Sequence, residues 1–264
     1  MPQRIVLRRS RRNIRWVRIT VLGGCGAWPV PDQGCSGYLV EHGGFRLLID
    51  PGYGTFQALL RTTAAERVDA VLVSHGHPDH CADLNPLLRA RALGPDPCAP
   101  LPVHSLPGAL GPVLALDSPH MLATAYRLAE FTAGHRFAIG PFTVDARCTP
   151  HFVPNAAVRL AAGGSTLVYT GDSGPSPELD ALAAGADVLL AEATFVERVV
   201  PDSDSPHLST AWQAGRCATR AAVGRLVLTH LWPGTDRSAA RSAARREYRG
   251  AIDVAEPGLT IEPG

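Results

Sequence analysis

The chain has 264 residues, a charged content of 19% and a formal net charge of +1. Its length suits one large α/β domain or two small ones with a substantial core, and its near-neutral charge excludes the overall basic excess that is typical of nucleic-acid-binding proteins. No apolar run is long enough to cross a bilayer, and the N-terminal segment lacks the apolar core of a signal peptide. We therefore expect a cytoplasmic protein that does not bind a membrane.

The N-terminal segment carries an unusual concentration of charge. Every basic residue of the chain is an arginine, and seven of them occupy the first eighteen positions: Arg4, Arg8, Arg9, Arg11, Arg12, Arg15 and Arg18. Such a segment is typical either of an arm that binds nucleic acid or an anionic surface, or of a solvated tail. We favour the tail and predict it over residues 1–16. Residues 17–264 are expected to form one domain, because no linker-like change of composition divides them.

Strand and helix patterns alternate along the chain. Predicted strands cover 17–22, 38–41, 46–50, 70–74 and, more weakly, 101–104, followed by a pair within 137–147 and by 158–160, 165–170, 187–190 and 225–229. Predicted helices cover 54–63, 82–92, 121–131, 178–184, 209–222 and 238–248. Because strands recur in both halves with helices between them, two mixed sheets with helices packed outside would satisfy the pattern.

The stretch Ser74-His75-Gly76-His77-Pro78-Asp79-His80 directly follows a predicted buried strand. Lone histidines are usually structural, but three imidazoles and a carboxylate at His-x-His-x-Asp-His spacing are much harder to explain in that way. Imidazole and carboxylate ligands suit zinc and also iron or manganese. The sequence therefore predicts a metal site at the end of this strand, with four candidate ligands: His75, His77, Asp79 and His80.

Four more candidate residues lie at the ends of other predicted strands or in a loop: His151, Asp172, His207 and His230. Tips of different strands can converge on one rim of a sheet, so these distant residues can meet the first cluster. Together they supply enough groups for two metal ions about 3.5–4 Å apart that share a hydroxide. Asp172 lies in the tight turn Gly171-Asp172-Ser173-Gly174, where one carboxylate can donate an oxygen to each ion.

These residues resemble, over roughly 17–262, the metallo-β-lactamase superfamily, whose fold is a four-layer αββα sandwich of two mixed β-sheets with outer helices. The flanking motifs look like its ribonuclease Z-related phosphodiesterase branch: Thr170-Gly171-Asp172-Ser173, Ala191-Glu192-Ala193-Thr194-Phe195, His207-Leu208-Ser209 and Leu228-Thr229-His230. The opening Ile19-Thr20-Val21-Leu22-Gly23 with Ser36-Gly37-Tyr38-Leu39 resembles short actinobacterial members that are regarded as atypical cyclic-nucleotide phosphodiesterases.

The resemblance implies a role for each candidate residue. One metal ion would be held by His75, His77 and His151, and the second by Asp79, His80 and His230, with Asp172 between them. Two Zn²⁺ ions are expected, with Mn²⁺ or Fe as alternatives. The catalytic residues that it implies are Asp79, His207 as the general acid near the leaving oxygen, and Glu192 as the residue that supports His207. The loop after His207 is one residue longer than the usual His-x-Thr-Ala spacing.

The implied activity is that of a dinuclear-metal phosphodiesterase that cleaves a small phosphodiester, such as a cyclic nucleotide, with a bridging hydroxide. Members that process tRNA carry a long basic arm between the third histidine motif and the bridging aspartate, whereas here His151 and Asp172 are 21 residues apart. Three alternatives stay open: a ribonuclease Z-like RNA 3′-end endonuclease, a hydrolase of a lactone or thioester, and a non-catalytic metal-binding protein. Dimers are common among such relatives, so a homodimer is expected.

Overall fold

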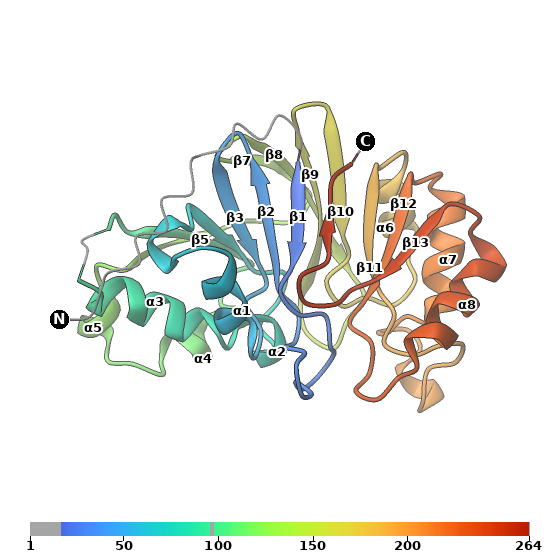
Figure 1. The fold of residues 1–264 in the computed structure, drawn as a ribbon, viewed down its shortest axis with the longest axis horizontal. Coiled ribbons are helices and arrows are strands. Elements are labelled where there is room, and N and C mark those ends of the chain that lie inside the picture. The colour runs from blue at the N-terminus through green and yellow to red at the C-terminus, as the bar shows by residue number, and fades with distance from the viewer. Residues whose placement is uncertain (1–16, 96–97, 264) are drawn as a thin grey trace.

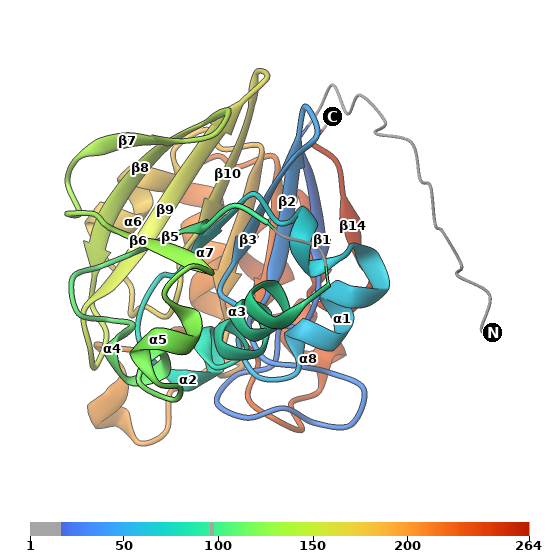
Figure 2. The same cartoon turned by 90° about the vertical axis from the view of Figure 1, so that its left-hand side faces the viewer.

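The computed structural model describes residues 17–95 and 98–263, so the Arg-rich tail predicted over 1–16 lies outside the described residues. Two seven-stranded sheets face each other, with helices on their outer sides (Figures 1 and 2). This arrangement confirms the predicted α/β class with two mixed sheets and outer helices. Among the described residues, no helix has the combined length and apolar character that crossing a membrane requires.

The first sheet is built from the N-terminal half of the chain and closed by its last strand. Its order is β14 (Thr260–Ile261), β1 (Arg18–Val21), β2 (Tyr38–His42), β3 (Phe45–Ile49), β4 (Ala70–Leu72), β5 (Leu101–Ser105) and β6 (Tyr126–Glu130). The pairs from β14 to β3 are antiparallel, and those from β3 to β6 are parallel.

The second sheet repeats this plan with the C-terminal half. Its order is β13 (Ala251–Val254), β12 (Arg225–Thr229), β11 (Val188–Glu192), β10 (Ser165–Tyr169), β9 (Asn155–Ala162), β8 (Phe142–Thr149) and β7 (Arg136–Ile139). The pairs from β13 to β10 are parallel, and those from β10 to β7 are antiparallel. The parallel strands β10, β11 and β12 therefore end at the same edge of the sheet.

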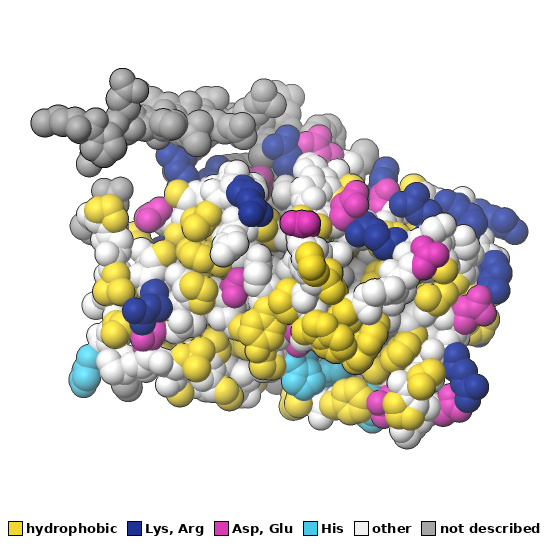
Figure 3. Space-filling view, turned by 60° about the horizontal axis from the view of Figure 1, so that its bottom comes forward, with side chains coloured by type: hydrophobic (Ala, Val, Ile, Leu, Met, Phe, Trp, Pro, Cys, Tyr) yellow, Lys and Arg dark blue, Asp and Glu magenta, His cyan; other side chains and the backbone are white. Residues whose placement is uncertain are grey.

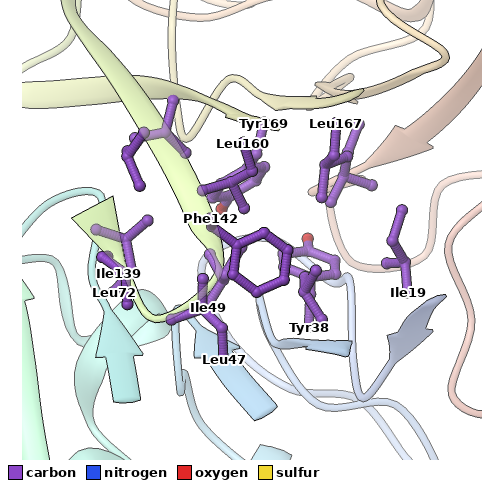
Figure 4. Packing of buried hydrophobic residues seen from close by; sticks show 14 of the residues in the cluster. Ile19, Tyr38, Leu47, Ile49, Leu72, Ile139, Phe142, Leu160, Leu167 and Tyr169 are labelled. Atoms are coloured by element: carbon purple, nitrogen blue, oxygen red, sulfur yellow. The ribbon is translucent and has the colours of Figure 1, made fainter. Parts of the chain in front are cut away.

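Three apolar clusters hold the layers together. The inner faces of the two sheets pack on each other through buried residues such as Tyr38, Ile49, Phe142, Leu160 and Tyr169 (Figure 4). Outside the first sheet lie α1 (Thr55–Thr62) and α3 (Leu84–Leu93), and outside the second lie α6 (Pro177–Ala183), α7 (Ala211–Arg220) and α8 (Arg237–Glu247). Because strand residues alternate between faces, one strand contributes to an inner and an outer cluster at once.

The helix predicted over 121–131 is wrong. Here α5 (Pro119–Leu122) ends early, and β6 pairs in parallel with β5 through Tyr126↔Leu101 to Glu130↔Ser105. The sequence Tyr-Arg-Leu-Ala-Glu has good helix formers, but edge-strand pairing overrides their intrinsic preference. The remaining short helical segments are η1 (Ala65–Arg67), α2 (Pro78–Cys81), α4 (Gly111–Leu114) and η2 (Asp202–Asp204).

Candidate metal centre

The candidate residues follow the carboxyl ends of strands from both sheets. In the second sheet β8, β10, β11 and β12 run in the same direction, so their ends meet at one edge. His151, Asp172 and His230 come just after three of these strands. The loop after β4 in the first sheet brings His75 to His80 against the same edge. Figure 3 shows histidine side chains gathered at this end of the molecule.

One group of ligand atoms surrounds a point between the sheets. The Nδ1 atom of His77 lies 3.1 Å from Nε2 of His75 and 3.1 Å from Nε2 of His151. Oδ2 of Asp172 lies 3.8 Å from each of the same two Nε2 atoms. All four ligand atoms lie within 4.8 Å of one another. Their separations fit the corners of a tetrahedron around a zinc-sized ion, whose bonds to nitrogen and oxygen are about 2.0–2.2 Å long.

A second group shares the same carboxylate. Nε2 of His230 lies 3.1 Å from Oδ2 of Asp79 and 3.2 Å from Oδ2 of Asp172. Nε2 of His80 lies 3.2 Å from Oδ1 of Asp172 and 3.6 Å from Oδ2 of Asp79. These four ligand atoms also lie within 4.8 Å of one another. Asp172 belongs to both groups, as one carboxylate would if it joined two ions.

Two buried polar atoms indicate that the site is built for cations. Nε2 of His80 and Oδ1 of Asp172 are buried and lie 3.2 Å apart, but within the described residues neither makes a well-aligned hydrogen bond. Buried polar groups are normally paired, since an unpaired one costs about 1–3 kcal/mol. Both atoms point into the second group, where a cation would satisfy them. The donor set of imidazoles and carboxylates suits zinc, iron or manganese.

The protonation states of the first group favour a metal over a proton. Burial lowers the pKa values of three imidazoles, those of His75, His77 and His151. These side chains are therefore neutral at neutral pH, which is the form that binds a metal. In the apolar interior a charged imidazole would lose its hydration without full compensation.

In the second group, the pKa values of the imidazoles are raised rather than lowered. Burial lowers the pKa of His80, but the carboxylates of Asp172 and Asp79 outweigh it and raise that pKa overall. The same balance raises the pKa of His230. The neighbouring imidazoles in turn lower the pKa values of both carboxyl groups despite their burial. The carboxylates thus attract positive charge at this point, whether it is supplied by protons or by a metal ion.

Asp50 fixes the orientation of His80. Its Oδ2 atom lies 2.8 Å from Nδ1 of His80 and accepts hydrogen bonds from the hydroxyls of Ser74 at 2.6 Å and Tyr169 at 2.7 Å. Its Oδ1 atom accepts from the Ser74 backbone N–H at 2.7 Å. Asp50 has a φ of +46°, a left-handed conformation that non-glycine residues rarely adopt. With Nδ1 held by Asp50, the ring directs Nε2 toward Asp79 and Asp172.

Glu192 is linked by hydrogen bonds to the surroundings of His230 and to the loop that carries His207. The Thr194 hydroxyl donates to Oε1 of Glu192 at 2.7 Å and lies 3.0 Å from Nδ1 of His230. The backbone N–H groups of Ser173 and Ser209 donate to the same carboxylate. Burial and the charge of Asp172 raise the pKa of Glu192 to about 8. No hydrogen bond between described residues joins Glu192 to the imidazole of His207, so the expected support reaches that loop only through the Ser209 backbone.

His207 lies beside the first group without belonging to it. Its carbonyl oxygen accepts a hydrogen bond from Nδ1 of His151 at 3.0 Å, and its ring centroid lies 4.9 Å from that of Phe152. The half-buried imidazole has a buried Nδ1 atom with no partner among the described residues. The structure therefore places a titratable group next to the ligands but outside both ligand groups.

Comparison with known proteins identifies the family. Residues 45–231 match the β-lactamase superfamily domain, which is more than half of the chain. The chain belongs to the metallo-β-lactamase superfamily. This superfamily member is 31% identical over 250 residues to the probable metallo-hydrolase YhfI of Bacillus subtilis (strain 168), with 93% of this chain and 100% of YhfI covered. It is 32% identical over 269 residues to ribonuclease Z of Mycobacterium bovis (strain BCG / Pasteur 1173P2), with coverage of 90% and 95%.

Solved structures agree with this assignment. The crystal structure of YhfI from Bacillus subtilis superimposes on the metallo-β-lactamase domain with a TM-score of 0.84 at 31% identity, covering 93% of this chain and 98% of that one. Zn²⁺-bound PqqB from Methylobacterium extorquens has a TM-score of 0.70 at 20% identity, with coverage of 92% and 99%, and shows the fold alone. The expected ribonuclease Z-like resemblance is confirmed, and the chain is a metal-dependent hydrolase.

Proposed function

We propose that this hydrolase is a dinuclear phosphodiesterase that cleaves a small phosphodiester such as a cyclic nucleotide. The observation that carries the proposal is the position of Asp172, whose carboxylate belongs to two separate groups of ligand atoms. A shared carboxylate keeps two ions close enough to act on one phosphate. His75, His77 and His151 would hold one ion, and Asp79, His80 and His230 the other.

When bound, two divalent ions would offset the negative charge of the phosphodiester and supply an ionised water as the nucleophile. Zinc is the metal that we propose, because the donors are imidazoles and carboxylates and because the PqqB structure of the same fold contains Zn²⁺. Manganese and iron are the alternatives. The residues of the chain supply the remaining functions: they position the substrate, exclude water and transfer a proton.

His207 is the proposed general acid. Its backbone carbonyl contacts the ring of His151 and its own imidazole lies against Phe152, so a phosphodiester held at the centre would have its leaving oxygen within reach of this loop. Protonation of that oxygen is worth about 10²–10⁴-fold in rate. Asp79 has a second proposed role besides binding an ion. It accepts a hydrogen bond from the backbone N–H of Ala27 at 2.9 Å and so fixes the loop that covers the second group.

The segment between His151 and Asp172 supports a small substrate. It consists of β9 and β10, which form a hairpin around Gly163-Gly164 with Ser165 opposite Ala162. This tight hairpin leaves no long basic arm at the position where such an arm would grip tRNA. A single phosphodiester at the metal centre is thus a better fit than a large folded RNA.

The 32% identity to ribonuclease Z favours one second candidate, an RNA 3′-end endonuclease. Contacts with several RNA phosphates would make binding fall steeply with salt, with a slope set by the number of phosphates neutralised. Hydrolysis of a lactone or thioester would use the same ions on a carbonyl group, and fold similarity alone does not exclude it. A non-catalytic metal-binding protein would load metal and hydrolyse none of these substrates.

One substrate panel separates these candidates. The zinc- or manganese-loaded protein is assayed with 3′,5′-cyclic mononucleotides, bis(p-nitrophenyl) phosphate, a lactone and a precursor tRNA. We expect turnover of the first two, and we expect Asp172→Ala to abolish both metal loading and turnover. The matched control is Glu262→Ala, which removes an exposed carboxylate that pairs with Arg18 at the start of β1 and should change neither. Cleavage of only the precursor tRNA or only the lactone would overturn the proposal.

A further inference from the structure

The loop that precedes Trp28 packs closely on the second ligand group. Ala27 donates its backbone N–H to Oδ2 of Asp79 at 2.9 Å, and Gly26 donates to the Leu231 carbonyl at 2.9 Å. A Cβ atom on Gly26 would lie only 2.9 Å from the imidazole of His230, so glycine is needed for this approach. The loop is therefore held against two metal ligands by backbone contacts.

Two tryptophans lie close to this contact along the chain. Trp28 follows Ala27, and Trp232 lies two residues after His230. Their ring centroids are 5.0 Å apart with an interplanar angle of 81°, an edge-to-face pair. Trp232 also stacks on Phe195 at 5.9 Å and 14°. We call these three side chains, Trp28, Phe195 and Trp232, the aromatic corner.

The aromatic corner is exposed although it is apolar. Trp28 is 47% exposed and Trp232 is 39% exposed, and Figure 3 shows hydrophobic side chains beside the histidines on this face. An edge-to-face pair meets at a right angle, so a flat ring that enters the corner stacks on one indole and meets the edge of the other. Phe195 stacks on Trp232 and so restricts the orientation of that indole.

The position of the corner determines what it can bind. Its residues lie one or two positions from Ala27, Thr194 and His230, each of which contacts the second ligand group or belongs to it. A phosphodiester at the metal centre would have one substituent directed toward the corner. Phe152, another exposed aromatic residue, already contacts the rings of His151 and His207 and therefore has less of its face free.

We propose that Trp28 and Trp232 form a stacking subsite for the planar base of a nucleotide substrate. This inference rests on the proposed phosphodiesterase function and specifies its substrate as a phosphodiester that carries a nucleobase. Alanine substitution of a stacking aromatic residue weakens binding roughly 5- to 100-fold per base. Stacking tolerates different bases because each base has a flat face. The subsite selects for the presence of a base rather than for its identity.

The first test compares two substrates that differ only in the base. The metal-loaded protein is assayed with a 3′,5′-cyclic nucleotide and with 1-O-methylribose 3′,5′-cyclic phosphate. Trp28→Ala and Trp232→Ala should lower kcat/KM for the nucleotide at least tenfold more than for the base-free compound, mainly through KM. Trp232→Phe should recover much of the difference, and Leu116→Ala, at an exposed apolar residue of another segment, should have no effect. Equal losses on both substrates, or none, overturn the subsite.

The second test is independent of turnover. Tryptophan fluorescence is followed while AMP or ribose 5-phosphate is added to the metal-loaded protein. We expect AMP to quench the emission and to bind at least tenfold more tightly than ribose 5-phosphate, with the difference lost in Trp28→Ala and Trp232→Ala at unchanged metal content. If AMP binds in this way while no cyclic nucleotide is hydrolysed, the proposed function fails and the subsite stands. Equal affinity for the two ligands in the unmodified protein overturns the subsite.

Discussion

The hydroxyl of Tyr169 donates a hydrogen bond of 2.7 Å to Oδ2 of Asp50 and thereby connects the two sheets at the metal centre. Tyr169 ends β10 in the second sheet, whereas Asp50 follows β3 in the first. The same oxygen of Asp50 lies 2.8 Å from Nδ1 of His80. Sheet packing and ligand orientation are thus coupled through one buried carboxylate.

Substitution of this tyrosine should cost more stability than substitution of its neighbour. Tyr38 is equally buried, and its ring centroid lies 5.1 Å from that of Tyr169, but its hydroxyl pairs with the neutral Thr229 hydroxyl at 2.6 Å. We expect Tyr169→Phe to lower the free energy of unfolding by about 1.5–3 kcal/mol and Tyr38→Phe by about 0.5–1.5 kcal/mol, because hydrogen bonds to charged groups contribute more. Denaturant unfolding of the metal-free proteins measures both. A Tyr38→Phe cost equal to or above that of Tyr169→Phe would contradict the coupling.

The Thr194 hydroxyl should matter for the second metal ion. It lies between Oε1 of Glu192 and Nδ1 of His230, so Thr194→Val keeps the shape of the side chain and removes both contacts. We expect affinity for one of two bound ions to fall about 10–100-fold, the range seen when such supporting hydrogen bonds are removed. Competition with a metal-sensitive dye measures both affinities.

Thr194→Ser is the matched control, since it restores the hydroxyl, and its metal affinities should stay close to those of the unmodified protein. Unchanged affinity in Thr194→Val, or equal weakening of both ions, would show that Thr194 does not act through His230.

His207→Ala should separate chemistry from metal binding. The imidazole lies outside both ligand groups, so two ions per chain should remain by elemental analysis while kcat falls about 10²–10⁴-fold. His135→Ala, which removes an exposed imidazole, should leave kcat unchanged. Loss of a metal ion from His207→Ala, or an unaltered kcat, would remove His207 from the role of general acid.

Chelation should destabilise the folded protein. A ligand that binds only the native state at 100 times its Kd stabilises it by about 2.7 kcal/mol, which for a domain of this size corresponds to roughly 5–10 °C in Tm. Treatment with EDTA should lower the Tm, measured by thermal unfolding, by at least this amount, and added zinc should restore the Tm fully. In Asp172→Ala the same treatment should have little effect. A Tm that does not respond to EDTA in the unmodified protein would show that the ions do not stabilise the fold.

The grouping of the candidate ligands could be predicted from sequence because each follows a recognisable strand. His75 to His80 form a dense motif, and Asp172 lies in a Gly-rich turn, so type and order of residues were sufficient. The contact between Asp50 and Tyr169 was not predicted, because 119 positions separate them and a buried tyrosine at the end of a strand usually indicates packing. The contact between them exists only once the two sheets face each other.

Other errors have related causes. The segment 121–131 has helix-forming residues, but the open edge of β5 recruits β6 as a strand. The strands β13 and β14 are short, and they were not predicted because their pairing partners, β12 and β1, lie elsewhere in the chain. The resemblance implied that Glu192 supports His207, and this role stays a prediction; the structure joins Glu192 through Thr194 to His230 and through the Ser209 backbone to the loop of His207. The homodimer stays a prediction.

The central claim is that two metal ions share the carboxylate of Asp172, and anomalous diffraction from zinc-loaded crystals tests it most directly. Data collected on both sides of the zinc absorption edge should give two peaks about 3.5–4 Å apart, one among His75, His77 and His151 and the other among Asp79, His80 and His230, with Asp172 touching both. A single peak at full zinc loading, or peaks away from Asp172, would contradict the account.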